Sequence, residues 1–380
     1  MSGIYIHIPF CKQACHYCNF HFSTSLENKE QFLRSLLHEI ELQQNYLTLP
    51  DGRKPEVKSI YFGGGTPSIL TQGEILLIVE TVNKYHHINA AAEITLEANP
   101  DDLSKTKLRA LKDTPVNRLS IGIQSFVEED LRFMNRAHSA AEGFRSIEEA
   151  KDAGFTNMTI DLIYGTPTLS LLNWEKNLEK AFSLNVPHLS CYCLTVEDKT
   201  ALASFVKNKK VDDVDEEKAI IQFQTLLKKI AENGYEQYEI SNFCKDGMYS
   251  QHNSNYWLKE NYLGLGPSAH SYNGTSRQWN IANNARYIES LKKNKVPFEK
   301  EELTMQQRFN EYILTSLRTK WGTDLNKIKG EFGESFYQSV IKEIQQYIRQ
   351  GNIIQKDQQI YLTDQGKLLA DKITSELFIV

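Results

Sequence analysis

The sequence predicts an α/β protein whose parallel sheet is followed by a smaller domain of helices and a hairpin. Short β-rich runs alternate with amphipathic segments over the first half of the chain, and strands separated by helices form right-handed crossovers in a parallel sheet. Beyond Pro297 the pattern changes to helical runs that lead into a hairpin. The alternation alone leaves two architectures open, a partly closed barrel of six β/α units and an open, doubly wound sheet.

Six β-rich runs are the predicted strands of the parallel sheet. They are Ile4–Ile8, Val57–Phe62, Glu93–Ala98, Arg118–Gln124, Met158–Ile163 and Leu189–Leu194. The segments between them are amphipathic at helical spacing, which predicts the connecting helices. The clearest of these helices are Lys29–Tyr46, Gln72–Tyr85, Ala140–Ala153 and Trp174–Leu184.

The middle of the chain has fewer clear elements. A helix is predicted at Asp215–Ala231 and a strand at Tyr235–Ile240. From Asn242 to Asn284 the chain is rich in Tyr, Asn, Gly and Ser and shows little periodicity, so we expect an irregular segment there. An irregular stretch of this length in a compact protein usually covers a site.

The last part of the chain predicts a winged-helix-like domain, because three helices precede a β-hairpin. The helices are Thr304–Leu317, Asp324–Phe332 and Glu334–Arg349, the hairpin is Asn352–Thr363, and a last helix is Lys367–Leu377. We therefore expect three units. They are the barrel or sheet over residues 1–200, an extension with the irregular segment over 201–297, and the winged-helix-like domain over 298–380.

Composition and charge exclude several classes of protein. The 380 residues are 41% hydrophobic and 24% charged, with a net charge of −5, whereas nucleic-acid and membrane-surface binders are normally basic. The helices of the C-terminal domain carry balanced charges and lack the basic excess that phosphate contacts need. The sequence has neither an 18-residue apolar stretch nor an apolar signal core, so we expect a cytoplasmic protein with no transmembrane segment and no nucleic-acid partner.

Cysteines are the most informative residues of the chain. Structural disulfides are rare in the cytosol, so the six cysteines are better interpreted as ligands, reactive thiols or small core residues. Cys11, Cys15 and Cys18 lie within eight residues, and thiolates suit iron–sulfur clusters and zinc. Three thiolates can hold a [4Fe–4S] cluster and leave its fourth iron open. The alternative is a zinc site completed by His16 or His21.

The residues around these cysteines resemble the radical S-adenosylmethionine (radical SAM) family. The run Tyr5–Cys11, with the sequence Tyr-Ile-His-Ile-Pro-Phe-Cys, leads into Cys15, Tyr17 and Cys18. It is most similar to the branch that contains oxygen-independent coproporphyrinogen III dehydrogenases and HemW-type heme chaperones, and the resemblance covers nearly the whole chain. It implies a partial (β/α)6 barrel that binds a [4Fe–4S] cluster and S-adenosylmethionine.

A glycine-rich loop follows the second predicted strand. It is Gly63–Pro67, with Gly64, Gly65 and Thr66 at its centre. Glycine lets backbone amides approach a ligand closely, although a plain strand-to-helix turn would have the same composition. The resemblance implies that this loop binds the amino group of the methionine moiety.

Polar residues at the ends of later strands extend this predicted site, because the carboxyl ends of parallel strands face the mouth of a barrel. Glu97 ends the third strand, Gln124 ends the fourth, Arg136 lies beyond it, and Asp161 is in the fifth. By resemblance, Glu97 and Arg136 hold the carboxylate side of the methionine moiety, and Gln124 and Asp161 hold the ribose hydroxyls. Tyr5 would lie beside the cluster.

Two departures separate this chain from the dehydrogenases of the branch. They carry a fourth cysteine two residues beyond the third, where this chain has Phe20, and an arm ahead of the cluster motif, where this chain has ten residues. Both departures argue against coproporphyrinogen oxidation. The form Cys-x3-Cys-x2-Cys-x-Phe is that of the heme chaperones.

A second motif, His252–Trp257, agrees with the chaperone interpretation. Its sequence His-Asn-Ser-Asn-Tyr-Trp resembles the heme-associated His-Asn-x-x-Tyr-Trp of that group. The resemblance implies heme binding by His252, Asn253, Tyr256 and Trp257, since imidazole is a common axial ligand and aromatic rings offer flat apolar faces. The alternatives are a loop histidine bonded to backbone with Trp257 in a local core, and His270 as the axial ligand.

The sequence therefore predicts a heme chaperone. Such a protein would carry a [4Fe–4S] cluster, S-adenosylmethionine and heme, take electrons from a donor, and pass heme to acceptor hemoproteins, expected to be respiratory. The alternative is an oxygen-independent coproporphyrinogen III oxidase that forms protoporphyrinogen IX by radical chemistry.

Overall fold

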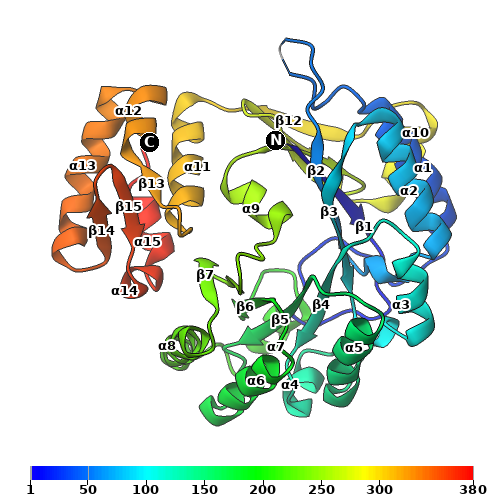
Figure 1. Ribbon diagram of the computed structural model, residues 1–380, viewed down its shortest axis with the longest axis horizontal. Helices are drawn as coiled ribbons and strands as arrows, with labels where there is room; N and C mark the ends of the chain where they lie inside the picture. The colour runs from blue at the N-terminus through cyan, green and yellow to red at the C-terminus, as the bar shows by residue number, and fades with distance from the viewer. Residues whose placement is uncertain (1, 50, 380) are drawn as a thin grey trace.

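One long sheet forms the centre of the computed structural model (Figure 1). Among the described residues, 2–49 and 51–379, twelve strands form it in the order β12-β11-β10-β9-β1-β2-β3-β4-β5-β6-β8-β7. Six central strands are parallel and follow one another in chain order. They are β1 (Ser2–Ile8), β2 (Val57–Gly64), β3 (Ile88–Ala98), β4 (Arg118–Gln124), β5 (Met158–Tyr164) and β6 (His188–Cys193).

The six parallel strands form a partial barrel. β6 pairs with β5 and with antiparallel β8, while β1 pairs with β2 and with parallel β9, so the described strands form an open sheet rather than a closed ring. The connecting helices lie along the outer side of this curve (Figure 1). The predicted α/β fold with a partial barrel is confirmed.

Alternation along β1 explains how the barrel has an apolar outside and a polar inside. Ile4, Ile6 and Ile8 are fully buried in the core that the strands share with the outer helices. Tyr5 and His7 point to the opposite face, because successive side chains of a strand alternate. The same alternation in the other strands lines the inside of the barrel with polar side chains.

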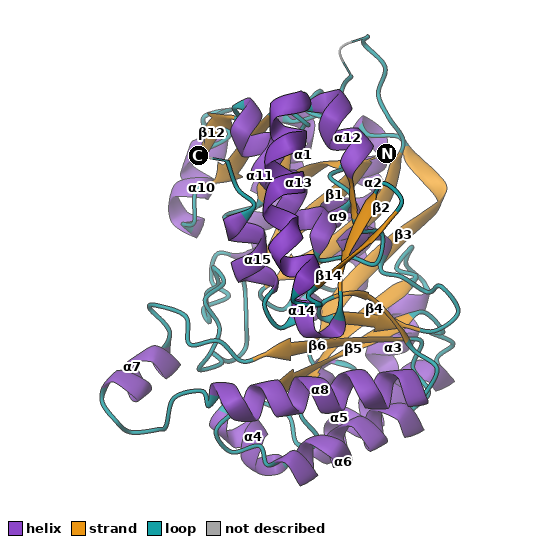
Figure 2. Cartoon of the chain, turned by 90° about the vertical axis from the view of Figure 1, so that its left-hand side faces the viewer, coloured by secondary structure: helices purple, strands orange, loops and turns teal. Residues whose placement is uncertain are grey.

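The outer helices begin at capping residues that the sequence provides. In α2 and α5, Thr71 and Ser139 accept a hydrogen bond from the backbone of Glu74 and Glu142, whose side chains accept one in return. The helices are α1 (Lys29–Leu42), α2 (Gln72–Tyr85), α3 (Lys105–Lys112), α4 (Glu128–Phe133), α5 (Ala140–Asp152), α6 (Leu171–Ser183), α7 (Ala201–Lys207) and α8 (Glu216–Glu232). Helix α7 projects from the rest of the molecule in Figure 2.

The expectation of an irregular segment from Asn242 to Asn284 is wrong. Short strands there extend both edges of the sheet, and one short helix lies between them. These elements are β8 (Asn242–Cys244), α9 (Gln251–Trp257), β9 (Asn261–Leu265), β10 (His270–Tyr272) and β11 (Ser276–Asn280), followed by α10 (Asn284–Lys292) and β12 (Phe298–Glu302). The predicted strand Tyr235–Ile240 is present just before them as β7 (Glu236–Glu239). Strands of three to five residues are too short to show periodicity, and pairing with distant strands stabilises them.

The C-terminal elements pack around a hydrophobic core of their own, from Phe309 to Leu377. Three helices precede a β-hairpin, and a short strand between the first two helices pairs with that hairpin to form a three-stranded antiparallel sheet, as in a winged helix. The elements are α11 (Met305–Leu317), β13 (Thr323–Asp324), α12 (Leu325–Glu331), α13 (Glu334–Arg349), β14 (Ile353–Lys356), β15 (Gln359–Leu362), α14 (Asp364–Lys367) and α15 (Ala370–Glu376). Helix α9 lies between this unit and the inner side of the barrel (Figure 1).

Candidate functional site

A cavity of about 450 Å³ opens at the carboxyl ends of the parallel strands. Its lining brings together three sets of residues that the sequence analysis selected separately: the cysteines, the glycine-rich loop and the polar strand ends. These residues are Cys11, Cys15, Cys18, Gly64, Gly65, Thr66, Glu97, Gln124, Arg136 and Asp161. They come from the five strands β1 to β5 or from the loops after them, so the curvature of the sheet brings them into one site.

The three cysteines lie on a loop that is fixed at both ends. The backbone N–H of Cys11 donates to the carbonyl of Ser23 (3.0 Å), and the N–H of Ser23 donates to the carbonyl of Pro9 (2.9 Å). Burial raises the pKa of the Cys11 thiol to about 11 and that of Cys18 above its usual value. Both therefore depend on metal coordination to become thiolates, which are the ligands an iron–sulfur cluster needs.

Each of the two histidines of the zinc alternative has one ring nitrogen in a hydrogen bond. His16 Nδ1 lies 2.8 Å from the carbonyl oxygen of Phe133, and His21 Nε2 lies 2.7 Å from Oδ1 of Asn284. Nowhere in residues 2–49 and 51–379 do three His, Cys, Asp or Glu side chains gather as ligands of a single metal ion. The three cysteines line one cavity, and their thiolates suit an iron–sulfur cluster.

The glycine-rich loop packs directly against the cysteine loop. Gly64 has φ +103°, and a Cβ on it would lie 2.5 Å from the His7 ring. A Cβ on Gly65 would lie 2.5 Å from the carbonyl oxygen of Phe10, and the N–H of Thr66 donates to that same oxygen (2.7 Å). Close packing therefore requires glycine at both positions, and the backbone conformation requires it at Gly64 as well.

Glu97 forms the carboxylate wall of the cavity. Its Oε1 accepts a hydrogen bond from Tyr61 OH (2.8 Å), and its Oε2 accepts one from the N–H of Gly64 (3.2 Å). Burial raises the pKa of Glu97 to about 7, against the effect of the Tyr61 hydrogen bond, and the nearby Asp161 raises it further. Such a carboxyl gains from a cation placed beside it.

Arg136 forms the cationic side of the cavity. Its Nη2 donates to Oδ1 of Asn99 (2.7 Å) and to the carbonyl of Gly122 (2.8 Å), while Nη1 lies 3.3 Å from Sγ of Cys15. Its buried Nε has no hydrogen-bond partner among the described residues. The guanidinium is thus held in place beside Cys15.

Asp161 and Gln124 lie on the remaining wall of the cavity. Burial raises the pKa of Asp161 to about 6, against the effect of hydrogen bonds from the hydroxyls of Ser190 and Ser120, the latter with Oγ 3.5 Å from Oδ2. Gln124 ends β4 with φ +65°, the left-handed region that non-glycine residues seldom adopt. This conformation turns the chain at the cavity edge, and such outliers cluster at functional sites.

The His252–Trp257 motif is placed differently from the cavity residues. It forms helix α9, and of its members Asn253 lines the cavity. His252 and Tyr256 lie in the interior, and Arg318 lies 5.8 Å over the Trp257 ring. His270 is exposed at the start of β10, where it stacks on Trp279. The predicted cluster and S-adenosylmethionine residues thus share one cavity with Asn253, except Tyr5, whose ring stacks on that of the cavity residue Tyr61.

Several cavity residues were missed by sequence reasoning. They are Phe22, Tyr61, Asn99, Ser120, Ser190, Tyr192 and Cys193. Five of them lie on strands that were predicted, namely Tyr61 on β2, Ser120 on β4, and Ser190, Tyr192 and Cys193 on β6. Ser120 is four residues before Gln124 on the same strand, so counting back by twos from Gln124 could have found it.

Comparisons with known proteins agree with this arrangement. Residues 5–181 match the radical SAM superfamily, and residues 303–369 match the HemN C-terminal domain. The solved structure of coproporphyrinogen III oxidase (HemN) from Escherichia coli superposes with a TM-score of 0.85 at 23% identity, covering 99% of this chain and 90% of that one. At this identity the likeness shows a shared fold.

Curated relatives are similar over the full length of the chain. The heme chaperone HemW of Bacillus subtilis is 34% identical over 98% of both chains, and that of Lactococcus lactis is 30% identical over 100% of this chain and 97% of its own. No helix within the described residues combines the length and apolar character of a membrane span. Full-length similarity at this level, together with the cysteine loop and the strand-end cavity, places the chain in the HemW family of radical SAM proteins.

Proposed function

We propose that the protein is a heme chaperone that binds a [4Fe–4S] cluster, S-adenosylmethionine and heme, and passes heme to acceptor hemoproteins. The similarity to the HemW proteins over 98% of both chains is the observation that carries this proposal. The acceptors are expected to be respiratory hemoproteins, and the site of action the cytoplasm. An electron donor for the cluster is a further expected partner.

Cys11, Cys15 and Cys18 would hold the cluster. When bound, such a cluster supplies one-electron chemistry at the sulfonium of S-adenosylmethionine. The residues around it are suited to this, because Arg136 lies against Cys15 and offers positive charge beside a thiolate. The Gly65 and Thr66 backbone holds the cysteine loop in place.

The charges of the cavity favour one orientation of S-adenosylmethionine. Glu97 and the Gly64–Gly65 loop suit the amino group, and Arg136 suits the carboxylate. This differs from the sequence-based assignment of Glu97 to the carboxylate side, since two carboxylates repel each other. Asp161 and Gln124 would accept hydrogen bonds from the ribose hydroxyls. The Tyr5 ring, which stacks on the Tyr61 ring, would support Tyr61 from the interior of the barrel.

The cavity rim is the proposed heme surface. Phe20, Phe22, Tyr192 and Asn253 meet there. Phe20 is 66% exposed, the largest exposed fraction among the large hydrophobic side chains of the described residues. It stands at the position where dehydrogenases carry a fourth cysteine, so the rim presents a flat apolar ring in place of a thiol.

A parallel assay tests the proposal. Anaerobically reconstituted protein is given heme in one arm and coproporphyrinogen III in the other, under reducing conditions with S-adenosylmethionine. We expect a Soret band that stays with the protein through gel filtration, and no protoporphyrinogen IX. Formation of protoporphyrinogen IX would replace the chaperone by a coproporphyrinogen III oxidase, and absence of retained heme would reject heme binding.

A further inference from the structure

His252 is a buried histidine with both ring nitrogens occupied. Its Nδ1 lies 2.8 Å from Ser59 Oγ on β2, and its Nε2 lies 2.9 Å from Tyr256 OH one turn further along α9. The side chain is 1% exposed, and burial lowers its pKa to about 3. A neutral imidazole has one donor and one acceptor, and two hydroxyls satisfy both.

The His252 ring belongs to a stacked aromatic layer below the cavity. Its centroid lies 5.1 Å from that of Tyr61 at an interplanar angle of 24°, and 6.4 Å from that of Tyr5 at 29°. Tyr61 OH donates to Glu97 on the cavity wall. On the other side, Tyr5 OH lies 3.2 Å from His7 Nδ1, and His7 Nε2 lies 2.8 Å from the His21 carbonyl oxygen of the cysteine loop.

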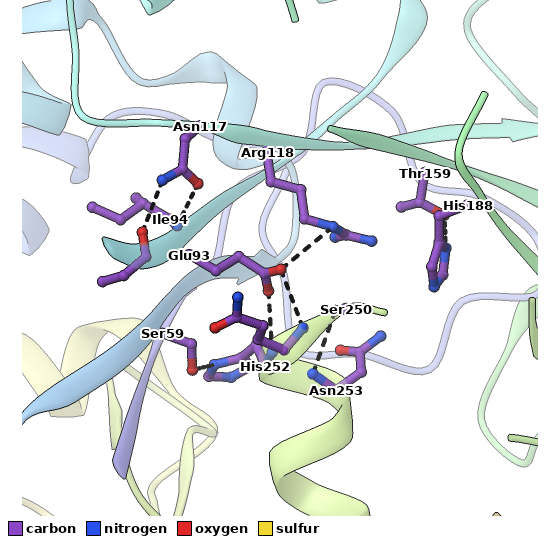
Figure 3. A network of polar contacts seen from close by, with 12 residues as sticks. Ser59, Glu93, Ile94, Asn117, Arg118, Thr159, His188, Ser250, His252 and Asn253 are labelled. Atoms are coloured by element: carbon purple, nitrogen blue, oxygen red, sulfur yellow. Dashed lines mark hydrogen bonds and ion pairs between the residues drawn. The ribbon is translucent and has the colours of Figure 1, made fainter. Parts of the chain in front are cut away.

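The backbone of α9 is fixed to the barrel as well. The N–H groups of Gln251 and His252 donate to the Glu93 carboxylate, each at 3.1 Å. Glu93 in turn forms an ion pair with the buried Arg118, with Oε2 3.8 Å from Nε. Figure 3 shows this network, in which Ser59, Glu93 and Arg118 come from three neighbouring strands and surround the start of α9. The position of the His252 ring is therefore set from three sides.

The far end of α9 is held by the C-terminal unit. Arg318 lies over the Trp257 ring and forms ion pairs with Glu239 (3.7 Å) and Asp371 (2.6 Å). Lys259, just after the helix, pairs with Glu311 of α11 (3.5 Å). Helix α9 thus connects the C-terminal unit to the layer beneath the cavity.

We propose that His252 is a positioning residue, which holds Tyr61, and through it Glu97, in the geometry that binds S-adenosylmethionine. The proposal concerns the S-adenosylmethionine site of the proposed function and replaces the axial-ligand role that the sequence predicted for His252. To reach a heme iron, His252 would have to break the hydrogen bond to Tyr256 or to Ser59 and leave the aromatic layer. Its nitrogens face partners inside the barrel, while Asn253 beside it faces the cavity.

Substitutions that separate stacking, hydrogen bonding and metal ligation test this role. S-adenosylmethionine affinity is measured by calorimetry on reconstituted protein, with iron and sulfide content and circular dichroism as folding controls. His252→Ala is expected to weaken binding about fivefold or more at unchanged cluster content. Ser59→Ala, which leaves the imidazole intact, should also weaken S-adenosylmethionine binding. The double variant Ser59→Ala/His252→Ala should lose no more affinity than His252→Ala alone.

His252→Phe decides between the two roles. A phenyl ring keeps the stacking on Tyr61 but has no lone pair, so a positioning role predicts partial recovery of S-adenosylmethionine affinity and an unchanged Soret band of bound heme. Ser254→Ala is the matched control on the same helix, because the Ser254 hydroxyl is buried without a hydrogen-bond partner among the described residues. Ser254→Ala should bind S-adenosylmethionine with the affinity of the parent protein.

Two outcomes would contradict the proposal. One is parental S-adenosylmethionine affinity in both His252→Ala and Ser59→Ala. The other is a Soret shift or loss of heme in both His252→Ala and His252→Phe with affinity for S-adenosylmethionine intact, which would restore the axial ligand. Parent protein that binds no S-adenosylmethionine at all would instead reject the proposed function on which the inference rests.

Discussion

Two sets of polar residues in the barrel differ in what surrounds them: the cavity wall, formed by Glu97, Arg136 and Asp161, and the floor below it, formed by Glu93, Arg118 and His252. The wall residues line an open cavity of about 450 Å³. On the floor, both nitrogens of His252 and both oxygens of Glu93 have partners inside the protein, while Arg118 keeps Nε and Nη2 without a hydrogen-bond partner among the described residues. Polar groups that face an open cavity are available to a ligand, and polar groups paired inside the protein form a scaffold.

The largest expected effect is loss of the cluster. Cys11→Ala, Cys15→Ala or Cys18→Ala each removes one thiolate from the wall, while the apolar core of the barrel rests on strands and outer helices. We expect iron and sulfide to fall close to background with circular dichroism unchanged. Cys244→Ala is the control, because Cys244 is buried on β8 away from the cavity. Iron and sulfide at parental levels in all three variants would rule out this cluster site.

On the floor, substitution should cost stability rather than ligand affinity. Glu93→Ala leaves the buried Arg118 and two backbone N–H groups of α9 unpaired. Breaking a buried ion pair from one side costs about 3–5 kcal/mol of unfolding free energy, which chemical denaturation will measure. Asp161→Ala is the corresponding variant on the wall, and it should lower the free energy of unfolding by less than a third of the loss in Glu93→Ala. Equal losses of unfolding free energy in Glu93→Ala and Asp161→Ala would contradict the distinction between wall and floor.

On the wall, Asp161→Ala and Gln124→Ala should weaken S-adenosylmethionine binding at unchanged cluster content. A hydrogen bond to a charged group is worth about 1.5–3 kcal/mol, or roughly ten- to a hundredfold in affinity for Asp161. Gln124→Ala should cost less, because its amide is neutral. Calorimetry on reconstituted protein measures both. Parental affinity in both would show that the ribose does not lie on this wall.

The smallest expected effect is a pH dependence from Glu97. Its folded pKa, about 7, lies above the ordinary 4.5, so its contribution to stability is fully present below pH 4.5 and is lost as pH rises through about 7. The cavity leaves the group partly hydrated, and we expect ~2 kcal/mol of unfolding free energy to be lost across this window. Glu97→Gln should remove most of that slope, and an identical slope in both proteins would contradict the assignment.

The sequence predicted the wall far better than the floor. The cysteines, the glycine loop and the strand ends are close to their strands in the sequence, and parallel strands necessarily bring their carboxyl ends together. The floor depends on contacts between His252 and residues more than 150 positions away, namely Glu93 and Ser59. No local pattern indicates that a histidine in a short helix is buried, and the expectation of ligation came from the resemblance of the His252–Trp257 motif.

The middle of the chain shows the same limit. The strands β9 to β11 are stabilised by pairing with β1 and with one another, and their own residues give little strand signal. Longer elements with strong periodicity, such as α2 and α13, were predicted with the observed or nearly observed bounds. Segment length and the sequence distance of the stabilising contacts therefore decided which elements could be predicted.

Titration of the reconstituted protein with S-adenosylmethionine tests the account most directly, because the account holds that the cysteine loop and the polar wall form one binding site. The measurement compares parent protein with Cys15→Ala, which lacks the thiolate beside Arg136. The account predicts one molecule bound per chain in the parent and at least tenfold weaker binding in the variant. Equal affinity with and without the cluster would contradict it.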